Sequence, residues 1–219
     1  LQIITRYIIE KNVKPLDWYK VKGKPIASNP ELLQASSIID CECILADSIE
    51  KSQDIEFTPK VLAFDIETEE LEIGKGKIIM ISLVSKNLKK VITFKKAEHQ
   101  PDFVEYVKDE KELIERFQEY IKKESPDIIT GYFSDGFDLP YIRARAEVNK
   151  IKLNLGLDQK GIKFLRGTFA PAKITGIVHI DLYKFIDTIF SVNLQSETIS
   201  LNDVAKELLG EKKHEFDFE

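Results

Sequence analysis

Cysteine, histidine and long apolar runs are scarce in this chain of 219 residues, and each shortage excludes a class of protein. The two cysteines, Cys41 and Cys43, lie too close together for an ordinary structural disulfide. With only three scattered histidines they form no zinc-binding pattern. No apolar stretch approaches the roughly 20 residues that a membrane-spanning helix needs. We therefore expect a cytoplasmic chain in a reducing setting, with no membrane among its partners.

Positive charge is also in short supply, because the formal net charge is −5. This balance excludes a surface coated with basic side chains, so any contact with nucleic acid should be local. We favour a simple solvated surface for the basic clusters that the chain does contain. They are Lys89 with Lys90, Lys95 with Lys96, and Arg143 with Arg145.

The chain begins at Leu1, and its single methionine is Met80. We therefore expect a piece of a longer polypeptide. A hydrophobic fraction of 43% is enough for a real core. The sequence pattern becomes regular only after Thr58, which predicts a boundary there. Residues 1–58 carry no obvious chemistry, and residues 59–219 form the domain that does.

Apolar runs and helical periodicity alternate from residue 59 onward. Leu113, Ile114, Phe117 and Ile121 recur at the spacing of one helical face, which predicts a helix that Pro126 closes. Two apolar runs separated by "APAK" predict a hairpin. The full prediction is strands at 61–64, 78–85, 91–94 and 127–130, the hairpin at 162–168 and 174–181, and helices at 109–123, 139–150, 181–190 and 201–210. This order predicts an α/β fold, a mixed sheet flanked by helices.

The stretch "KVLAFDIETEE", residues 60–70, ends an apolar strand in two carboxylates. Asp65 and Glu67 are two apart, so they share one face of the strand while Ile66 points into the opposite layer. Like charges side by side repel, and Mg²⁺ prefers oxygen ligands of this kind. Two such ions about 3.5–4 Å apart activate a water and stabilise the leaving oxygen of a phosphodiester. Taken alone, however, an Asp-x-Glu pair is more often a solvated strand end.

A third carboxylate, Asp138, follows the turn-rich loop in "TGYFSDGFDLPY", residues 130–141. It stands just before a predicted helix with Pro140 in the first turn. Spacing alone therefore favours a role as the N-cap of that helix.

Several ordered motifs together resemble the family B DNA polymerases, in their archaeal form. "LAFDIET" is followed 73 residues later (138 − 65) by an Asp within "GYFSDGFDLPYIRARAE", and these resemble that family's first and second exonuclease motifs. The pieces "GKGKIIMIS", "ELIERFQEYIKKESPDIITGY", "HIDLYKFI" and "LNDVAKELLGEKKHEF" follow the same order. The resemblance covers residues 58–219, and "ITRYIIEKN" is similar to the end of the family's amino-terminal domain.

The resemblance implies a ribonuclease H-like fold with an inserted β-hairpin, and a proofreading 3′–5′ exonuclease of a DNA-directed DNA polymerase. It implies two-metal hydrolysis at the 3′ end of single-stranded DNA or a frayed primer, with the remainder of the polymerase chain as a partner. Asp65, Glu67 and Asp138 would be the catalytic carboxylates and hold two Mg²⁺ or Mn²⁺ ions. The substrate-binding residues would be Tyr132, Phe133 and Phe137.

The sequence leaves two interpretations of Asp181 open. It would support the site from behind the metal ligands, or it would cap the helix that begins at Leu182.

The chain departs from the family pattern at two places. Phe133 stands where the second motif usually has Asn, which removes a hydrogen bond to the substrate strand. The third motif, Tyr-x-x-x-Asp, would follow beyond Glu219, so we expect residues 59–219 to be truncated before it and weak or inactive alone. Tyr183 and Asp187 do fit that pattern, but "HIDLYKFI" matches the segment before the genuine motif. We therefore interpret Asp187 as an exposed helix residue.

Two rival functions remain open. One is a non-catalytic single-stranded-DNA-binding or scaffold domain of exonuclease ancestry. The other is a stand-alone exonuclease or ribonuclease H relative, which would have to recruit Asp187 as a ligand. Under the favoured reading, residues 1–58 are a remnant of the polymerase amino-terminal domain and its linker.

Overall fold

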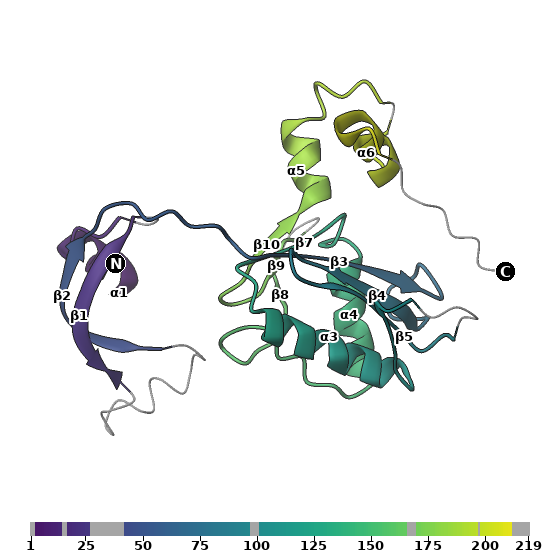
Figure 1. Ribbon diagram of the computed structural model, residues 1–219, viewed down its shortest axis with the longest axis horizontal. Coiled ribbons are helices and arrows are strands. Elements are labelled where there is room, and N and C mark those ends of the chain that lie inside the picture. Colours follow the sequence, from purple (N-terminus) through teal and green to yellow (C-terminus); the bar gives the residue numbers. More distant parts are fainter. Residues whose placement is uncertain are drawn as a thin grey trace. The chain divides into compact units, whose positions relative to one another are not determined.

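The computed structural model describes residues 3–14, 17–26, 42–96, 101–165, 170–196 and 198–211 (Figure 1). The chain divides into two compact units. The first comprises Leu1–Thr58 with Leu157–Gln159, and the second comprises Pro59–Gly156 with Lys160–Glu219. The division after Thr58 coincides with the change of sequence pattern there.

The described residues of the first unit form one helix and one pair of strands. Its elements are α1 (Ile3–Glu10), β1 (Tyr19–Pro25) and β2 (Ile44–Lys51). The two strands pair antiparallel. None of the described residues of this unit is buried, so its described part contributes no apolar core.

The second unit is built on a mixed sheet with the strand order β10-β7-β3-β4-β5-β6. The strands β3, β4 and β5 pair antiparallel, whereas β7 is parallel to both β3 and β10, and β6 is parallel to β5. This architecture confirms the predicted α/β fold with a mixed sheet. The strands are β3 (Val61–Thr68), β4 (Ile78–Val84), β5 (Lys89–Thr93), β6 (Val104–Tyr106), β7 (Ile128–Gly131) and β10 (Val178–Asp181).

Helices accompany the sheet, as predicted. The N-cap of α3 is Asp109, whose side chain accepts a hydrogen bond from the Glu112 amide. Ser125 ends this helix in a left-handed conformation. The apolar face of α3 packs on β4 and β5. The helices of this unit are α3 (Glu110–Glu124), α4 (Asp138–Val148), α5 (Leu182–Ile189) and α6 (Leu201–Leu209).

The core lies between the sheet and the helices α3 and α4. On β3, the alternate residues Leu62, Phe64 and Ile66 are buried. The ring of Phe64 meets that of Phe117 on α3 at a centroid distance of 5.9 Å. Because one face of β3 fills the core, its other face is left for polar side chains.

The predicted hairpin is only partly correct. Two short strands, β8 (Lys163–Phe164) and β9 (Ala172–Lys173), do pair antiparallel. Residues 166–168 of its first arm lie outside the described residues. The second arm was wrong, because residues 178–181 form β10, which joins the main sheet beside β7. An apolar run predicts a strand but does not specify which partner it pairs with.

Candidate active site

The strand β3 places Asp65 and Glu67 on one face, as the sequence predicts. Ile66, between them, is 5% exposed and points into the core. Asp65 is exposed and Glu67 is half-buried. The pairing of β3 with β4 is irregular directly after Glu67, where the register shifts. Both carboxylates therefore lie near the end of the strand, away from the packed layer.

Asp138 comes to this strand end by a long-range contact. The pairing of β3 with β7 stops at Ala63 and Thr130, where the loop 131–138 begins. Beyond that point the Asp138 Oδ1 atom accepts a hydrogen bond from the Ile66 amide, at 3.2 Å. The Asp138 side chain thus provides a hydrogen-bond acceptor for a backbone N–H group of β3 that lies beyond the residues paired with β7.

The expectation that Asp138 caps its own helix was wrong. The N-cap position of α4 is Phe137, and no side chain caps that end of the helix. Asp138 is the first helical residue, and its carboxylate reaches back to Ile66 on β3. Sequence spacing could not distinguish these arrangements, because both place an Asp at the start of a helix.

Burial and the nearby charge of Asp65 raise the pKa of Asp138 from 3.8 to about 7. Asp138 is only 3% exposed, so its charged form loses most of its hydration. A divalent cation beside the two carboxylates would reverse this effect by favouring the charged form. The donor chemistry therefore suits a hard cation.

The part of the chain that the structure describes contains no group of three or more His, Cys, Asp or Glu side chains close enough together to hold a metal ion. The structure brings Asp138 into electrostatic contact with Asp65 and places Glu67 on the same face of β3. Asp65 and Asp138 are therefore the pair of carboxylates that could hold a cation, and Glu67 is a third carboxylate on the same face of β3 as Asp65.

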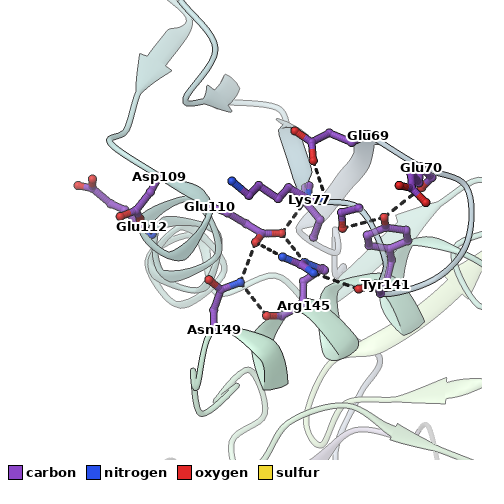
Figure 2. Close-up of polar contacts among 12 residues, drawn as sticks. Glu69, Glu70, Lys77, Asp109, Glu110, Glu112, Tyr141, Arg145 and Asn149 are labelled. Carbon is purple, nitrogen blue, oxygen red and sulfur yellow. Dashed lines mark hydrogen bonds and ion pairs between the residues drawn. The ribbon is translucent and has the colours of Figure 1, made fainter.

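A buried ion pair fixes α4, the helix that Asp138 begins (Figure 2). Arg145 donates two hydrogen bonds to Glu110 on α3, from Nε at 2.7 Å and from Nη2 at 2.6 Å. Glu110 also accepts hydrogen bonds from the Ile78 amide and from Asn149. Burial alone would raise the pKa of Glu110, but these hydrogen bonds outweigh it and lower the pKa. The pair therefore joins α3, α4 and β4.

The same helix holds the turn that follows Glu67. Arg145 donates a further hydrogen bond to the Gly74 carbonyl, at 3.0 Å. The hydroxyl of Tyr141 lies 2.9 Å from the carbonyl oxygen of Gly76 and 3.0 Å from that of Glu70 (Figure 2). These contacts tie the helix that begins at Asp138 to the turn beyond Glu67.

The proposal that Arg143 and Arg145 belong to one solvated basic cluster was wrong for Arg145. Its side chain is 9% exposed and engaged with Glu110. Arg143 instead lies over the Phe164 ring, at 4.5 Å from its centroid. Among the lysines, Lys89 lies 4.6 Å from the Phe103 ring centroid and Lys95 lies 5.6 Å from that of Phe94.

The structure confirms one of the two interpretations of Asp181, the helix cap. It is the N-cap of α5, where its side chain accepts a hydrogen bond from the Tyr183 amide at 3.0 Å. It also accepts hydrogen bonds from the amides of Phe133 and Asp135, each at 2.9 Å. One buried carboxylate thus fastens the start of a helix to the loop that leads to Asp138.

The aromatic side chains of the loop pack mainly on the protein itself. The Phe133 and Tyr132 rings both meet the Tyr183 ring edge-on, at centroid distances of 5.2 and 5.8 Å. The Tyr132 hydroxyl donates to the Ile199 carbonyl. Phe137 packs against Tyr141 at 5.3 Å. All three residues are half-buried.

Phe133 has an unusual backbone conformation, with φ at +61°. Its ring lies so close to Gly136 that a Cβ there would come within 2.4 Å of it. The loop therefore needs glycine at 136 to accommodate the Phe133 ring.

Sequence reasoning missed a group of polar side chains, most of them buried, that hold this loop to its neighbours. Only Asp181 and its neighbour His179 gave a signal, since residues two apart on a strand share a face. The contacts of the missed residues join segments that are far apart in sequence. They are Ser134, Asp135, His179 and Lys184.

Asp187, by contrast, is exposed on α5, as predicted. No helix among the described residues combines the length and the apolar character that a bilayer crossing requires.

Comparison with known proteins identifies the family. The profile described as "DNA polymerase family B, exonuclease domain" matches residues 1–204. The chain belongs to the family B DNA polymerases. The predicted resemblance is thereby confirmed, and the matched part of the family is its exonuclease domain.

Curated relatives at this level of similarity are polymerases of much greater length. The chain is 43% identical over 158 residues to a DNA polymerase of Pyrococcus glycovorans, a match that covers 70% of this chain and 20% of the relative. It is 39% identical over 161 residues to a DNA polymerase of Thermococcus litoralis, covering 70% of this chain and 9% of the relative. The chain thus spans a fifth or less of these relatives.

A solved structure supports the fold. The family B DNA polymerase from the hyperthermophilic archaeon Pyrobaculum calidifontis matches with a TM-score of 0.68. The match covers 97% of this chain and 25% of that chain, at 20% sequence identity.

Proposed function

We propose that this chain is the proofreading part of a DNA-directed DNA polymerase and removes nucleotides from the 3′ end of single-stranded DNA. Under this proposal residues 59–219 form a ribonuclease H-like 3′–5′ exonuclease domain with an inserted hairpin, and residues 1–58 come from the polymerase amino-terminal domain. The remainder of the polymerase chain is its partner. Membership in the family supports the exonuclease and polymerase assignments, and the division after Thr58 supports the boundary between the two parts.

The observation that carries the proposal is the meeting of Asp138 with β3. Its buried carboxylate is held by the Ile66 amide, between Asp65 and Glu67 in sequence, and burial together with the nearby charge of Asp65 raises its pKa. A fold rarely keeps a buried carboxylate beside a second one without a function for the pair. A hard cation at this position is the simplest such function.

Asp65, Glu67 and Asp138 are the residues that would hold Mg²⁺ or Mn²⁺. Two bound ions would supply an activated water and a stabilised leaving oxygen at the terminal phosphodiester. Asp65, the more exposed carboxylate, is available to a cation from the solvent side. Asp138 would contribute a second carboxylate, whose position is fixed by its hydrogen bond from the Ile66 amide and by the loop that precedes it.

The proposed substrate is a strand end that is already unpaired. Such an end reaches the site without the cost of unstacking a duplex. Tyr132 and Phe133 are half-buried, and their rings would be the surface on which a terminal base stacks. Phe137 lies one residue before Asp138 and would limit the space beside the reacting phosphate.

The test is degradation of a 5′-labelled single-stranded oligonucleotide in Mg²⁺ or Mn²⁺. The parent chain is compared with its Asp65→Ala/Glu67→Ala variant. We expect weak shortening from the 3′ end that requires the metal and disappears in the variant. Equal degradation by the two proteins would overturn the proposal, because the activity would then come from elsewhere.

One observation favours the alternative of a domain that binds single-stranded DNA without cleaving it. In the described residues, three carboxylates do not gather into one metal cluster. Under this alternative the oligonucleotide is bound with equal affinity by the parent and the double variant, and neither shortens it. Fluorescence anisotropy with the same oligonucleotide distinguishes the two functions.

A further inference from the structure

A second group of buried polar side chains lies against the loop 131–138, and Asp135 is its centre. Asp135 Oδ1 accepts a hydrogen bond from the Ala172 amide at 2.6 Å and lies 3.2 Å from His179 Nδ1. Its Oδ2 lies 2.5 Å from Lys184 Nζ. The three partners belong to β9, β10 and α5. One carboxylate thus joins the loop to three separate elements.

His179 extends this group by one more contact. Its Nε2 atom lies 2.9 Å from the Ser134 hydroxyl. Burial lowers the pKa of His179, so the ring carries a single proton at neutral pH. With that proton on Nδ1, the ring donates to Asp135 and accepts from Ser134. The two hydrogen bonds then satisfy both ring nitrogens.

The connectivity Ser134, His179, Asp135 matches that of a nucleophilic triad, but the burial does not. Ser134 is 0% exposed, and the His179 side chain is 2% exposed. A nucleophile must reach a substrate atom, and a hydroxyl enclosed in this way does not. The three residues therefore act on the loop itself.

The loop is fixed from two directions before it reaches Asp138. The carboxylate of Asp181 accepts from the amides of Phe133 and Asp135. The side chains of Ser134 and Asp135 are held by His179 and Lys184. The loop ends at Asp138, whose side chain contacts the Ile66 amide on β3. A change in the first set of contacts should therefore displace the last.

We propose that Asp135, held between His179 and Lys184, is the positioning residue that places Asp138 for binding a divalent cation. This inference rests on the proposed function, because it assigns Asp138 to the cation site. Asp135 itself would touch neither the ion nor the DNA. Residues that orient metal ligands from behind typically change metal affinity by about 10–100-fold when they are substituted.

The test measures Mn²⁺ binding to the full chain by electron paramagnetic resonance, at a temperature well below unfolding. The variants are Asp135→Asn, which keeps an acceptor for the Ala172 amide but loses the charge, and Lys184→Met. We expect each variant to weaken Mn²⁺ binding by roughly 10-fold or more. Lys184 is 31% exposed, so its substitution disturbs the packed interior less than Asp135→Asn does, and a circular dichroism spectrum verifies that each variant is folded before Mn²⁺ is added.

Two control variants separate positioning from stability. Lys111→Met removes an exposed lysine that pairs with Glu115 on α3, and it should bind Mn²⁺ as the parent does. Ile121→Val lowers the melting temperature through a core residue on α3. It should melt earlier and still bind Mn²⁺ as the parent does, because a purely structural loss does not move the loop.

The outcomes separate failure of this inference from failure of the proposed function. If Asp65→Ala/Glu67→Ala loses Mn²⁺ binding while Asp135→Asn and Lys184→Met keep the parent's affinity, the positioning role is wrong and the cation site stands. If the double variant binds Mn²⁺ as the parent does, the cation site is wrong and the positioning role with it. Weaker binding in Lys184→Met but not in Lys111→Met supports the inference.

Discussion

The carboxylate of Asp138 accepts a hydrogen bond from the Ile66 amide, across 72 positions of sequence. This contact joins the loop 131–138 to the strand that carries Asp65 and Glu67. It also buries one negative charge beside another, which neither the strand nor the loop would do separately. Several measurable consequences come from this arrangement.

Replacement of Asp138 by Asn should stabilise the protein at pH 8 in the absence of metal. The folded pKa of Asp138 is about 7 and its ordinary value is 3.8, so folding favours the protonated form. Its contribution to stability is complete below pH 3.8 and is lost as the pH rises through 7. The variant should therefore exceed the parent at pH 8 by up to about 4 kcal/mol.

Urea unfolding in EDTA between pH 5 and 8 measures this difference. Asp187→Asn is the matched control, because it removes an exposed carboxylate from α5. The control should leave the free energy of unfolding unchanged across the range. A parent as stable as Asp138→Asn at pH 8 would show that the buried carboxylate carries no strain.

Replacement of Glu110 by Gln should destabilise the protein by about 3–5 kcal/mol, because it leaves the buried Arg145 without its counter-charge. The pKa of Glu110 is lowered in the fold, so its stabilising effect is present above the ordinary value of 4.5 and is lost as the pH falls below it. The difference between parent and variant should therefore shrink in acid.

Glu119→Gln is a suitable comparison for Glu110→Gln. Glu119 pairs with Arg116 on the surface of α3, where both side chains are well exposed. Its loss should cost less than about 1 kcal/mol. Thermal unfolding at pH 7 and pH 4 would measure both variants, and equal losses in the two would contradict the special role of the buried pair.

Replacement of Phe133 by Asn should leave stability within about 1 kcal/mol of the parent. Asn tolerates a φ of +61° better than Phe does, which offsets the lost ring contact with Tyr183. If the amide restores a hydrogen bond to the DNA strand, cleavage should accelerate between about twofold and tenfold. Phe133→Leu has no amide and should not accelerate, so equal rates for the two variants would exclude that hydrogen bond.

Replacement of Asp187 by Asn should leave Mn²⁺ binding unchanged. Asp187 is exposed on α5, and a stand-alone exonuclease would have to recruit it as a ligand. Calorimetric titration with Mn²⁺ decides between these views. A large loss of affinity in this variant would favour the stand-alone enzyme.

The sequence predicted those features that depend on local pattern. Strand geometry predicted that Asp65 and Glu67 share one face of β3 and that Ile66 points into the opposite layer. The recurrence of Leu113, Phe117 and Ile121 predicted α3. These features follow from the periods of a strand and of a helix, which are visible in a short window.

Features that depend on distant partners were not predictable in this way. The strand β10 was mistaken for a hairpin arm, because its pairing with β7 joins residues about 50 positions apart in the chain. Arg145 looked like a surface charge until Glu110 was found beside it. The contacts of Asp135 with His179 and Lys184 likewise form only after the sheet and α5 come together.

The most direct test of the central claim is calorimetric titration of Mn²⁺ into the parent chain, Asp138→Asn and Asp65→Ala/Glu67→Ala at pH 8. The account predicts binding to the parent that is severely weakened in both variants, since the three carboxylates serve one cation site. Undiminished binding in Asp138→Asn would contradict it, because the buried carboxylate at Ile66 would then play no part in holding the ion.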